Sequence, residues 1–297
     1  MNRRRLLTLL GLAGVGGLAA CAPRAAAPGD PGDAVALEPV RIDYGDDPSQ
    51  YAELTLPEGA AKGVVVVIHG GFWRAQYDAS LGRPLAASLA EQGWVAWNLE
   101  YRRVGGGGGY PATFDDVAAG IDALAQVPDL DLGTVITLGH SAGGHLAVWA
   151  AGRAALPTGG DGDAGERAAG WGDPAVVVTA AVPQAGVLDL AGAVRDGVGG
   201  SAVTDLIGGG PDSTAFADRY PLTDPTMQLP LDVPVRAVHG RADTIVPLRQ
   251  SADYVRAASA AGADAELVEV EGDHFVVIDP GSPAWRTTLE VLEGLRG

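Results

Sequence analysis

The feature that most constrains the fold of this chain is a regular alternation of apolar runs with segments of helical periodicity. Residues 63–71, GVVVVIHGG, form a continuous apolar run that ends in two glycines. Such a run is typical of a strand buried on both faces of a parallel sheet. Residues 80–93 then carry apolar side chains at helical spacing and close on a glycine. Because strands that alternate with helices form βαβ units, the pattern predicts an α/β fold with a mostly parallel central sheet and helices on both faces.

The alternation continues to the end of the chain. A short antiparallel opening is predicted at residues 41–45 and 51–57, with further strands at 94–101, 134–141, 175–186, 233–240 and 265–272. Helices are predicted at residues 111–127, 143–153, 247–262 and 283–297. Residues 186–230 interrupt this alternation: they are rich in Gly, Asp and Pro and show only short stretches of strand or helix periodicity. We interpret this segment as a small cap inserted above the C-terminal edge of the sheet.

The composition is that of a folded, acidic protein. Of 297 residues, 47% are apolar and 19% are charged. The formal net charge of −17 argues against nucleic acid or an anionic lipid surface as an electrostatic partner. The chain holds a single cysteine, which excludes a disulfide within the chain.

That cysteine ends a segment with the parts of an export signal, MNRRRLLTLLGLAGVGGLAAC: three arginines, an apolar run and small residues before Cys21. The apolar run is short for a spanning helix. LAAC resembles the lipobox of bacterial lipoproteins, which implies that residues 1–20 are cleaved and that Cys21 carries lipid. A cleaved signal with an incidental cysteine is the alternative. The paired arginines also resemble part of a twin-arginine signal, so the export route stays open.

Residues 21–37 are rich in Ala, Pro, Gly and Asp and have no periodicity, which predicts a flexible tether. The folded domain is therefore expected over residues 38–297. We expect an exported protein on the outer side of the cell membrane, attached to the membrane through the N-terminal lipid anchor only.

The candidate nucleophile is Ser141, in the stretch TLGHSAGGHL. With 44 glycines in 297 residues, G-x-S-x-G is expected by chance about 0.2 times, so the context has to decide. Ser141 directly follows a predicted strand and precedes a predicted helix, which is the strand-turn-helix that the motif requires. Gly139 and Gly143 allow the tight turn, and the apex lies at the sheet edge where α/β folds bind ligands.

A serine hydroxyl needs a base within hydrogen-bond reach, and the chain has five histidines. His140 adjoins the serine, where side chains of such a turn diverge, so we expect it to be structural. His145 lies in the first turn of the following helix, and His69 and His239 end apolar strands. His274, in EGDHF after the last strand, can reach over the sheet edge and is the predicted base. It has no neighbour at metal-ligand spacing, so we expect neither a metal nor another cofactor.

The carboxylate that orients the base is predicted to be Asp243, which directly follows the strand before the one leading to His274. Asp224 lies in the inserted segment, and Asp273 adjoins the histidine and would point away from its ring. Asp189 also follows a strand, and we expect it to be a polar wall of the pocket.

The oxyanion hole is predicted at the end of the first buried strand, HGGFW, where two glycines let backbone N–H groups approach a substrate oxygen. Gly71 and Phe72 would donate there together with Ala142 at the start of the helix after the serine. Aromatic residues near this loop are candidates for a substrate wall, although packing between sheet and cap is the alternative. Arg102 and Arg103 either meet an anionic substrate or pair with nearby acids. The candidates for substrate contacts are Trp73, Tyr77, Tyr101 and Asp189.

With these motifs in place, residues 38–297 resemble the α/β-hydrolase superfamily, in which nucleophile, acid and base follow in the order of Ser141, Asp243 and His274. HGGFW at 69–73 and GHSAGGHLA at 139–147 look like the kynurenine formamidase and feruloyl-esterase-like branch, which is related to hormone-sensitive-lipase-like carboxylesterases.

The sequence departs from this pattern at one position, and at another it resembles a second group of enzymes. Phe72 replaces the third glycine of the H-G-G-G motif that those carboxylesterases carry. HGRADTIVP at 239–247 resembles the acid-bearing loop of prolyl-oligopeptidase-type enzymes, but the chain has no room for their large N-terminal propeller.

The resemblance implies a serine hydrolase that cleaves a carboxylic ester or a related acyl bond of a small molecule through an acyl-enzyme. Formamidase, amidase and small peptidase activity remain alternatives, and so does a non-catalytic surface protein that binds ligands on a hydrolase fold. The sequence leaves the acyl group, the leaving group and the oligomeric state open.

Overall fold

The computed structural model describes residues 38–157 and 171–296, within a compact unit that runs from Leu37 to the C-terminus. The predicted signal, Cys21 and the tether lie outside the described residues. The unit is built on an eight-stranded sheet in the order β1-β2-β4-β3-β5-β6-β7-β8. The strands are β1 (Val40–Asp43), β2 (Tyr51–Thr55), β3 (Val64–Ile68), β4 (Val95–Leu99), β5 (Val135–His140), β6 (Ala180–Gln184), β7 (Val235–Gly240) and β8 (Ala265–Val270).

β1 and β2 pair antiparallel, β2 joins β4 antiparallel, and all further pairs are parallel. The predicted fold class, α/β with a mostly parallel sheet, is therefore confirmed. Because the parallel strands share one direction, the C-terminal ends of β3, β5, β7 and β8 meet at one edge of the sheet. The segments predicted to carry the oxyanion hole, nucleophile, acid and base all follow these four ends.

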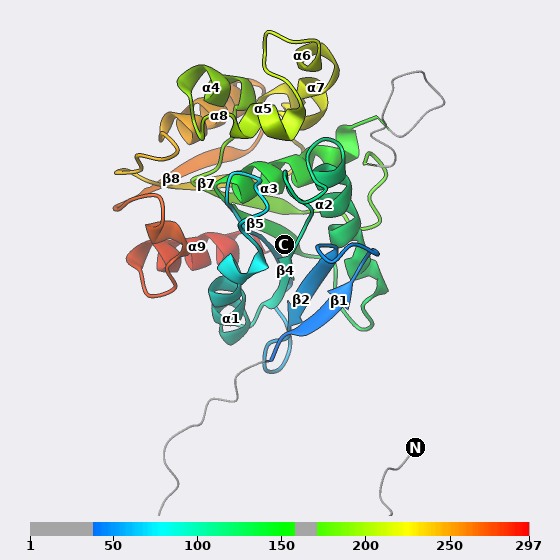
Figure 1. Ribbon diagram of the computed structural model, residues 1–297. Helices are drawn as coiled ribbons and strands as arrows, with labels where there is room; N and C mark the ends of the chain where they lie inside the picture. The colour runs from blue at the N-terminus through cyan, green and yellow to red at the C-terminus, as the bar shows by residue number, and fades with distance from the viewer. Residues whose placement is uncertain (1–37, 158–170, 297) are drawn as a thin grey trace, which may run out of the picture. The chain divides into compact units, whose positions relative to one another are not determined.

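Helices cover both faces of the sheet (Figure 1). α1 and α9 lie on one face, joined by a 2.9 Å hydrogen bond from Trp285 Nε1 to Ser88 Oγ, and α2, α3 and α8 lie on the other. The α-helices are α1 (Arg83–Glu91), α2 (Ala112–Asp122), α3 (Ala142–Gly152), α4 (Leu190–Asp196), α5 (Ala202–Ile207), α6 (Ala215–Asp218), α7 (Tyr220–Thr223), α8 (Arg249–Ala260) and α9 (Pro283–Gly294). Short 3-10 turns occur at Ala79–Leu81, Ala123–Gln126, Arg153–Ala155, Pro225–Gln228 and Val276–Ile278.

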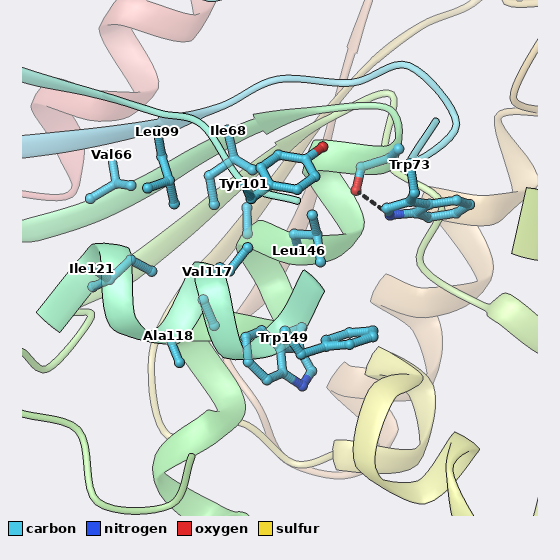
Figure 2. Close-up of a cluster of buried hydrophobic side chains, with 14 of the residues drawn as sticks. Val66, Ile68, Trp73, Leu99, Tyr101, Val117, Ala118, Ile121, Leu146 and Trp149 are labelled. Carbon is cyan, nitrogen blue, oxygen red and sulfur yellow. Dashed lines mark hydrogen bonds between the residues drawn. The ribbon is translucent and has the colours of Figure 1, made fainter. Parts of the chain in front are cut away.

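The continuous apolar run of β3 is explained by burial on both faces. Val64, Val66 and Ile68 lie in the core beneath α2 and α3, while Val65 and Val67 lie in the core beneath α1 and α9. All five are at most 2% exposed, and burying each contributes about 1.5–3 kcal/mol. Figure 2 shows the first of these cores, where β3 and β4 meet α2 and α3.

The inserted segment 186–230 lies between β6 and β7 and folds into α4 to α7, which gather on one side of the sheet, away from α1 (Figure 1). Its attachment to α3 uses two side-chain donors: His145 Nε2 bonds Thr223 O at 2.8 Å, and Trp149 Nε1 bonds Leu222 O at 2.9 Å. The strand predicted at 175–186 is shorter than expected, because β6 begins only at Ala180. Among the described residues, no helix is long and apolar enough to cross a membrane.

Candidate active site

Ser141 stands at the turn between β5 and α3 with φ 55° and ψ −115°, a backbone conformation that is strained for a residue with a side chain. Its side chain is nearly buried, at 3% exposure. The surrounding structure holds the turn from both sides, since Ser141 N donates to Gln184 O at 2.8 Å and Ser141 O accepts from His145 N at 3.2 Å. The residue predicted as nucleophile therefore occupies a rigid and strained apex.

The two glycines of the motif are required by space. A methyl group on Gly139 would lie 2.0 Å from Gly143 O, and one on Gly143 would lie 2.0 Å from Ile68 O. Both distances are far shorter than a carbon–oxygen contact allows. β5, α3 and β3 can therefore pack this closely only if positions 139 and 143 have no side chain. This close approach brings the end of β3 against the turn that carries Ser141.

Asp243 and His274 form a short hydrogen bond: Nδ1–H of His274 donates to Asp243 Oδ2 at 2.6 Å, with both side chains at most 4% exposed. The N–H groups of Ile245 and Val246 donate to the other carboxylate oxygen at 2.8 and 2.9 Å. Burial raises the pKa of Asp243, but the hydrogen bonds from the neighbouring histidines and amides outweigh burial and hold the pKa well below its usual range. The carboxylate therefore stays ionised beside the imidazole.

A second histidine stands next to this carboxylate. Nε2 of His239 lies 3.2 Å from Asp243 Oδ2 and donates to Val246 O at 3.0 Å, while Ser251 Oγ lies 2.8 Å from Nδ1. His239 therefore holds the turn whose amides bind Asp243. The sequence identified it only as a histidine at a strand end.

His140, expected to be structural, is buried and bonds to a backbone oxygen, and its ring lies beside the predicted base. Its ring lies 4.5 Å from the ring of His274, and its Nε2–H donates to His274 O at 2.9 Å. Burial and the neighbouring His274 lower the pKa of His140 to about 3, so the ring is neutral. As the last residue of β5, His140 reaches the loop after β8, a contact that the sequence did not predict.

The direct bond from Ser141 Oγ to His274 Nε2 is not formed among the described residues, whose hydrogen bonds at His274 involve Nδ1 and the backbone oxygen. The structure connects them through His140, which adjoins Ser141 in the chain and whose ring lies 4.5 Å from the ring of His274. Such serine–histidine bonds are often long before substrate binds.

The loop after β3 turns through three consecutive residues with positive φ: Gly71 at 110°, Phe72 at 55° and Trp73 at 54°. Two of them are not glycine, so the loop is strained and held by its surroundings. One restraint is the hydrogen bond from Trp73 Nε1 to Ala142 O at 3.1 Å, which ties the loop to the start of α3. The amides of Gly71 and Phe72 donate to no group that the structure describes, and Ala142 N is the first amide of α3, which has no partner within the helix.

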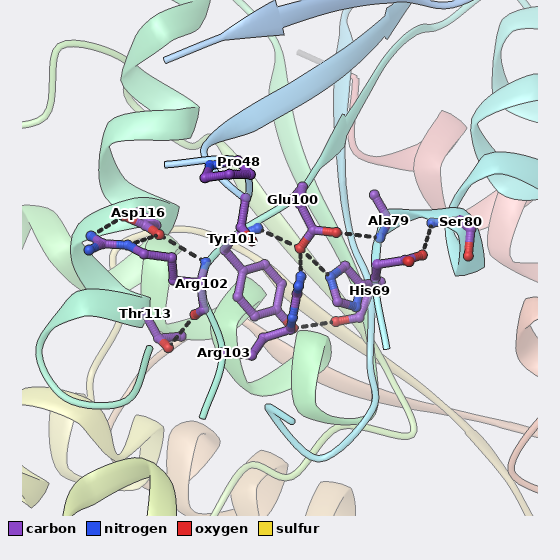
Figure 3. A network of polar contacts seen from close by, with 12 residues as sticks. Pro48, His69, Ala79, Ser80, Glu100, Tyr101, Arg102, Arg103, Thr113 and Asp116 are labelled. Atoms are coloured by element: carbon purple, nitrogen blue, oxygen red, sulfur yellow. Dashed lines mark hydrogen bonds and ion pairs between the residues drawn. The ribbon is translucent and has the colours of Figure 1, made fainter. Parts of the chain in front are cut away.

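A buried polar network around Glu100 holds the two ends of this loop (Figure 3). Oε1 of Glu100 lies 3.2 Å from His69 Nε2 and accepts from the Tyr101 amide, while Oε2 accepts from Ala79 N at 2.7 Å. Glu100 also forms an ion pair with Arg103. These contacts fix both ends of the segment 69–79 to the end of β4. This segment includes Gly71 and Phe72, so the loop predicted to form the oxyanion hole (the oxyanion loop) is held in place at both ends.

Several residues predicted to contact substrate have other roles in the structure. Tyr101 is fully buried, stacks on His69 at 4.6 Å and donates its hydroxyl proton to His69 O at 2.8 Å. Trp73 is 1% exposed and belongs to the core. Asp189 caps α4 by accepting from Gly192 N at 2.6 Å. Hydrogen bonding to the backbone explains all three, and only Tyr77, half-buried against Gly71, remains beside the loop.

The alternative acids and the arginines are also accounted for. Asp224 accepts from the amide and the hydroxyl of Thr226, and Asp273 accepts from the amides that follow His274. Arg102 makes a bidentate pair with the buried Asp116, so both arginines after β4 pair with acids rather than pointing into the site. Within the described residues, no three His, Cys, Asp or Glu side chains are grouped so that they could hold a metal ion.

Known proteins resemble the chain at low identity. Esterase LipC of Mycobacterium tuberculosis is 28% identical over 229 residues, which are 72% of this chain and 53% of that protein, so the chain spans about half of its length. A truncated carbohydrate esterase from gut microbiota superposes with a TM-score of 0.69 at 23% identity, covering 86% of this chain and 95% of the other. Esterase B of Lactobacillus rhamnosis gives a TM-score of 0.70 at 22% identity, covering 87% and 84%. These structural likenesses show the α/β-hydrolase fold.

The family model BD-FAE matches residues 53–257. The match begins in β2, includes Ser141 and Asp243, and ends within α8, ahead of His274. It covers more than half of the chain and contains the turn at Ser141, the loop after β3 that is predicted to form the oxyanion hole, and the loop that carries Asp243. The chain therefore belongs to the BD-FAE family of α/β-hydrolases.

Proposed function

We propose that this protein is a serine esterase that hydrolyses carboxylic esters of small molecules through Ser141, His274 and Asp243. The observation that carries the proposal is the 2.6 Å hydrogen bond between His274 Nδ1 and the buried Asp243, at the same sheet edge as the strained Ser141. The name "esterase" of the relatives supports an ester as the bond that is cleaved.

The hydrogen-bond pattern supports a proposed step for each group. When His274 is neutral and donates its Nδ1–H to Asp243, its Nε2 carries a free lone pair. This nitrogen takes the hydroxyl proton of Ser141 as Ser141 Oγ attacks the acyl carbon. The imidazolium, stabilised by Asp243, then returns that proton to the leaving alcohol as the carbon–oxygen bond breaks. Water repeats the sequence on the acyl-enzyme, releasing the acid and restoring Ser141.

The oxyanion that develops in both steps is proposed to accept from the amides of Gly71, Phe72 and Ala142. Two observations support these amides as donors: the loop is held in a strained conformation of positive φ, and Trp73 Nε1 donates to Ala142 O at 3.1 Å. Fixed donors of this kind need no reorganisation during the reaction, and losing one typically costs about 10²–10³ in kcat.

Ser141→Ala tests the nucleophile, with p-nitrophenyl acetate as substrate and circular dichroism as the check on folding. We expect turnover to be abolished and the fold to be retained, because the serine side chain is small and alanine keeps its Cβ. A fluorophosphonate probe should label the parent protein at Ser141 and leave the variant unlabelled. Substantial turnover by a folded Ser141→Ala protein would refute the assignment.

The bond type is tested by parallel assays on p-nitrophenyl acetate, N-formylkynurenine and a prolyl anilide. We expect the ester to be the best substrate by kcat/KM. A preference for the formamide would assign the chain to arylformamidases, and a preference for the anilide to peptidases. No labelling and no turnover of any of the three would favour a non-catalytic binding protein.

We also propose that the protein is exported and anchored by lipid on Cys21, supported by the LAAC sequence ahead of the tether. The full chain and a Cys21→Ser variant would be compared for partition into detergent phase and membrane pellet. We expect the parent in the membrane fraction and the variant in the soluble fraction. Equal membrane partition of the two would contradict lipidation.

A further inference from the structure

His140 adjoins or contacts three of the four segments of the proposed site, those of the nucleophile, the base and the oxyanion hole, although the mechanism gives it no chemical step. It directly precedes Ser141 in the chain, at the end of β5. Its Nε2–H donates to the backbone oxygen of His274 at 2.9 Å, and the two rings lie 4.5 Å apart with 49° between their planes. Its Nδ1 lies 3.1 Å from the position that a Cβ on Gly70 would take, so the ring also fills the space beside the oxyanion strand.

We propose that His140 is a positioning residue that fixes the separation between Ser141 and His274. This inference rests on the proposed function. Through its covalent link to Ser141 and its hydrogen bond to His274 O, His140 directly connects the nucleophile turn and the loop of the base, two segments that lie 133 residues apart in the chain. A displacement of about 1 Å between reacting groups can cost about 10²-fold in rate, so a connection that fixes their separation raises the rate of the reaction.

The protonation state of His140 suits this role. Because a carbonyl oxygen can only accept, Nε2 must carry the proton, which fixes the tautomer and leaves Nδ1 unprotonated in the neutral ring. The ionisable groups that face the ring are His274, Asp243 and His239. Burial, together with the positive charge that His274 carries when it is protonated, lowers the pKa of His140 to about 3. His140 therefore keeps its hydrogen bond through the cycle without competing for the transferred proton.

Two substitutions separate the hydrogen bond from the rest of the side chain. His140→Asn shortens the side chain so that its amide cannot reach His274 O, whereas His140→Gln places a donor near the position of Nε2. We expect His140→Asn to lower kcat for p-nitrophenyl acetate by about 10–100-fold with KM within about twofold of the parent. His140→Gln should regain most of this loss, to within about tenfold of the parent.

His145→Asn is the matched control. His145 is also buried, at 0% exposure against 8% for His140, and also donates from Nε2 to a backbone oxygen, Thr223 O at 2.8 Å, but it bonds to the inserted segment and does not contact His274. We expect a comparable loss of thermal stability with a much smaller fall in kcat. Equal kcat losses in His140→Asn, His140→Gln and His145→Asn would overturn the proposal, because they would indicate general destabilisation.

If His140→Asn does not fold, His140→Phe serves as the test, since the phenyl ring fills nearly the same volume and lacks the donor. A folded His140→Asn or His140→Phe protein with kcat within twofold of the parent would overturn the proposal. The rate of fluorophosphonate labelling provides the second readout. Slower labelling in these variants at equal KM supports positioning, whereas failure of the parent itself to be labelled at Ser141 would refute the proposed function and, with it, this inference.

Discussion

Gly143→Ala is the sharpest structural test of the nucleophile turn. The added carbon would lie 2.0 Å from Ile68 O and 2.6 Å from His69 O, whereas ordinary contact begins near 3.4 Å, so β3 and α3 must separate by about 1.4 Å. Overpacking of this kind costs about 1–3 kcal/mol and occasionally more, while the better helix propensity of alanine returns about 1 kcal/mol. We expect a net loss of about 1–2 kcal/mol, or roughly 2–8 °C in Tm.

The activity loss should be larger than the stability loss. The displaced strand end carries the oxyanion loop, and a shift of about 1 Å in a reacting group can cost about 10²-fold, so kcat for p-nitrophenyl acetate should fall by about that factor. The assay pairs thermal unfolding by circular dichroism with kcat and KM on the folded protein. A folded Gly143→Ala protein with the Tm and kcat of the parent would refute the packing argument.

Two other glycines separate steric crowding from backbone strain. Gly294 ends α9, and no described heavy atom lies within 4 Å of the position that an alanine Cβ would take there, so Gly294→Ala should leave Tm equal or slightly raised. Gly197 also has open space but has φ 71° at the C-terminus of α4, so Gly197→Ala should cost about 1 kcal/mol through strain alone. Neither substitution should change kcat by more than about twofold.

Three further predictions concern single contacts. Asp243→Asn should lower kcat by about 10⁴-fold with the fold intact, because an amide cannot hold His274 in the correct tautomer; kcat near that of the parent would contradict the assignment. Trp73→Phe removes the bond to Ala142 O and should lower kcat by about tenfold with a Tm loss of a few degrees, measured as above; an unchanged kcat would show that the bond does not hold the loop. Burial raises the pKa of Asp224 from 3.8 to about 6, so the folded state binds this proton more tightly than the unfolded chain. Between about pH 4 and 7 this group should therefore lower the free energy of unfolding by roughly 2–3 kcal/mol as pH rises, and urea unfolding of Asp224→Asn should lack that component; equal pH slopes in both proteins would contradict it.

The sheet and the segments that carry the proposed triad could be predicted because each depends on local sequence. Val64–Ile68 is apolar at every position, and only a strand buried on both faces needs that pattern. Residues 175–178 show the limit of the same argument: these four residues are also apolar, yet Val177 is 59% exposed and β6 begins only at Ala180. Apolar side chains alone do not show where a ladder of hydrogen bonds begins.

The direction of polar and aromatic side chains at strand ends could not be predicted. Tyr101 and Asp189 follow strands as catalytic residues do, but their partners are backbone groups of distant segments, His69 O and the start of α4. His140 is the opposite case, since the sequence places it at the end of a strand but does not show that its ring reaches His274, 134 positions away. These outcomes depend on tertiary contacts that no local pattern records.

The way in which the inserted segment is attached has a consequence for evolution. α3 contributes the two side-chain donors, His145 and Trp149, and the inserted segment contributes only the backbone oxygens of Leu222 and Thr223. Every amino acid supplies such an oxygen, so these two anchors place no demand on the residue types of the segment. The side chains at Leu222 and Thr223 can therefore change without loss of these two hydrogen bonds, whereas residues of the segment that pack in the core, such as Leu206 and Tyr220, are constrained by their neighbours.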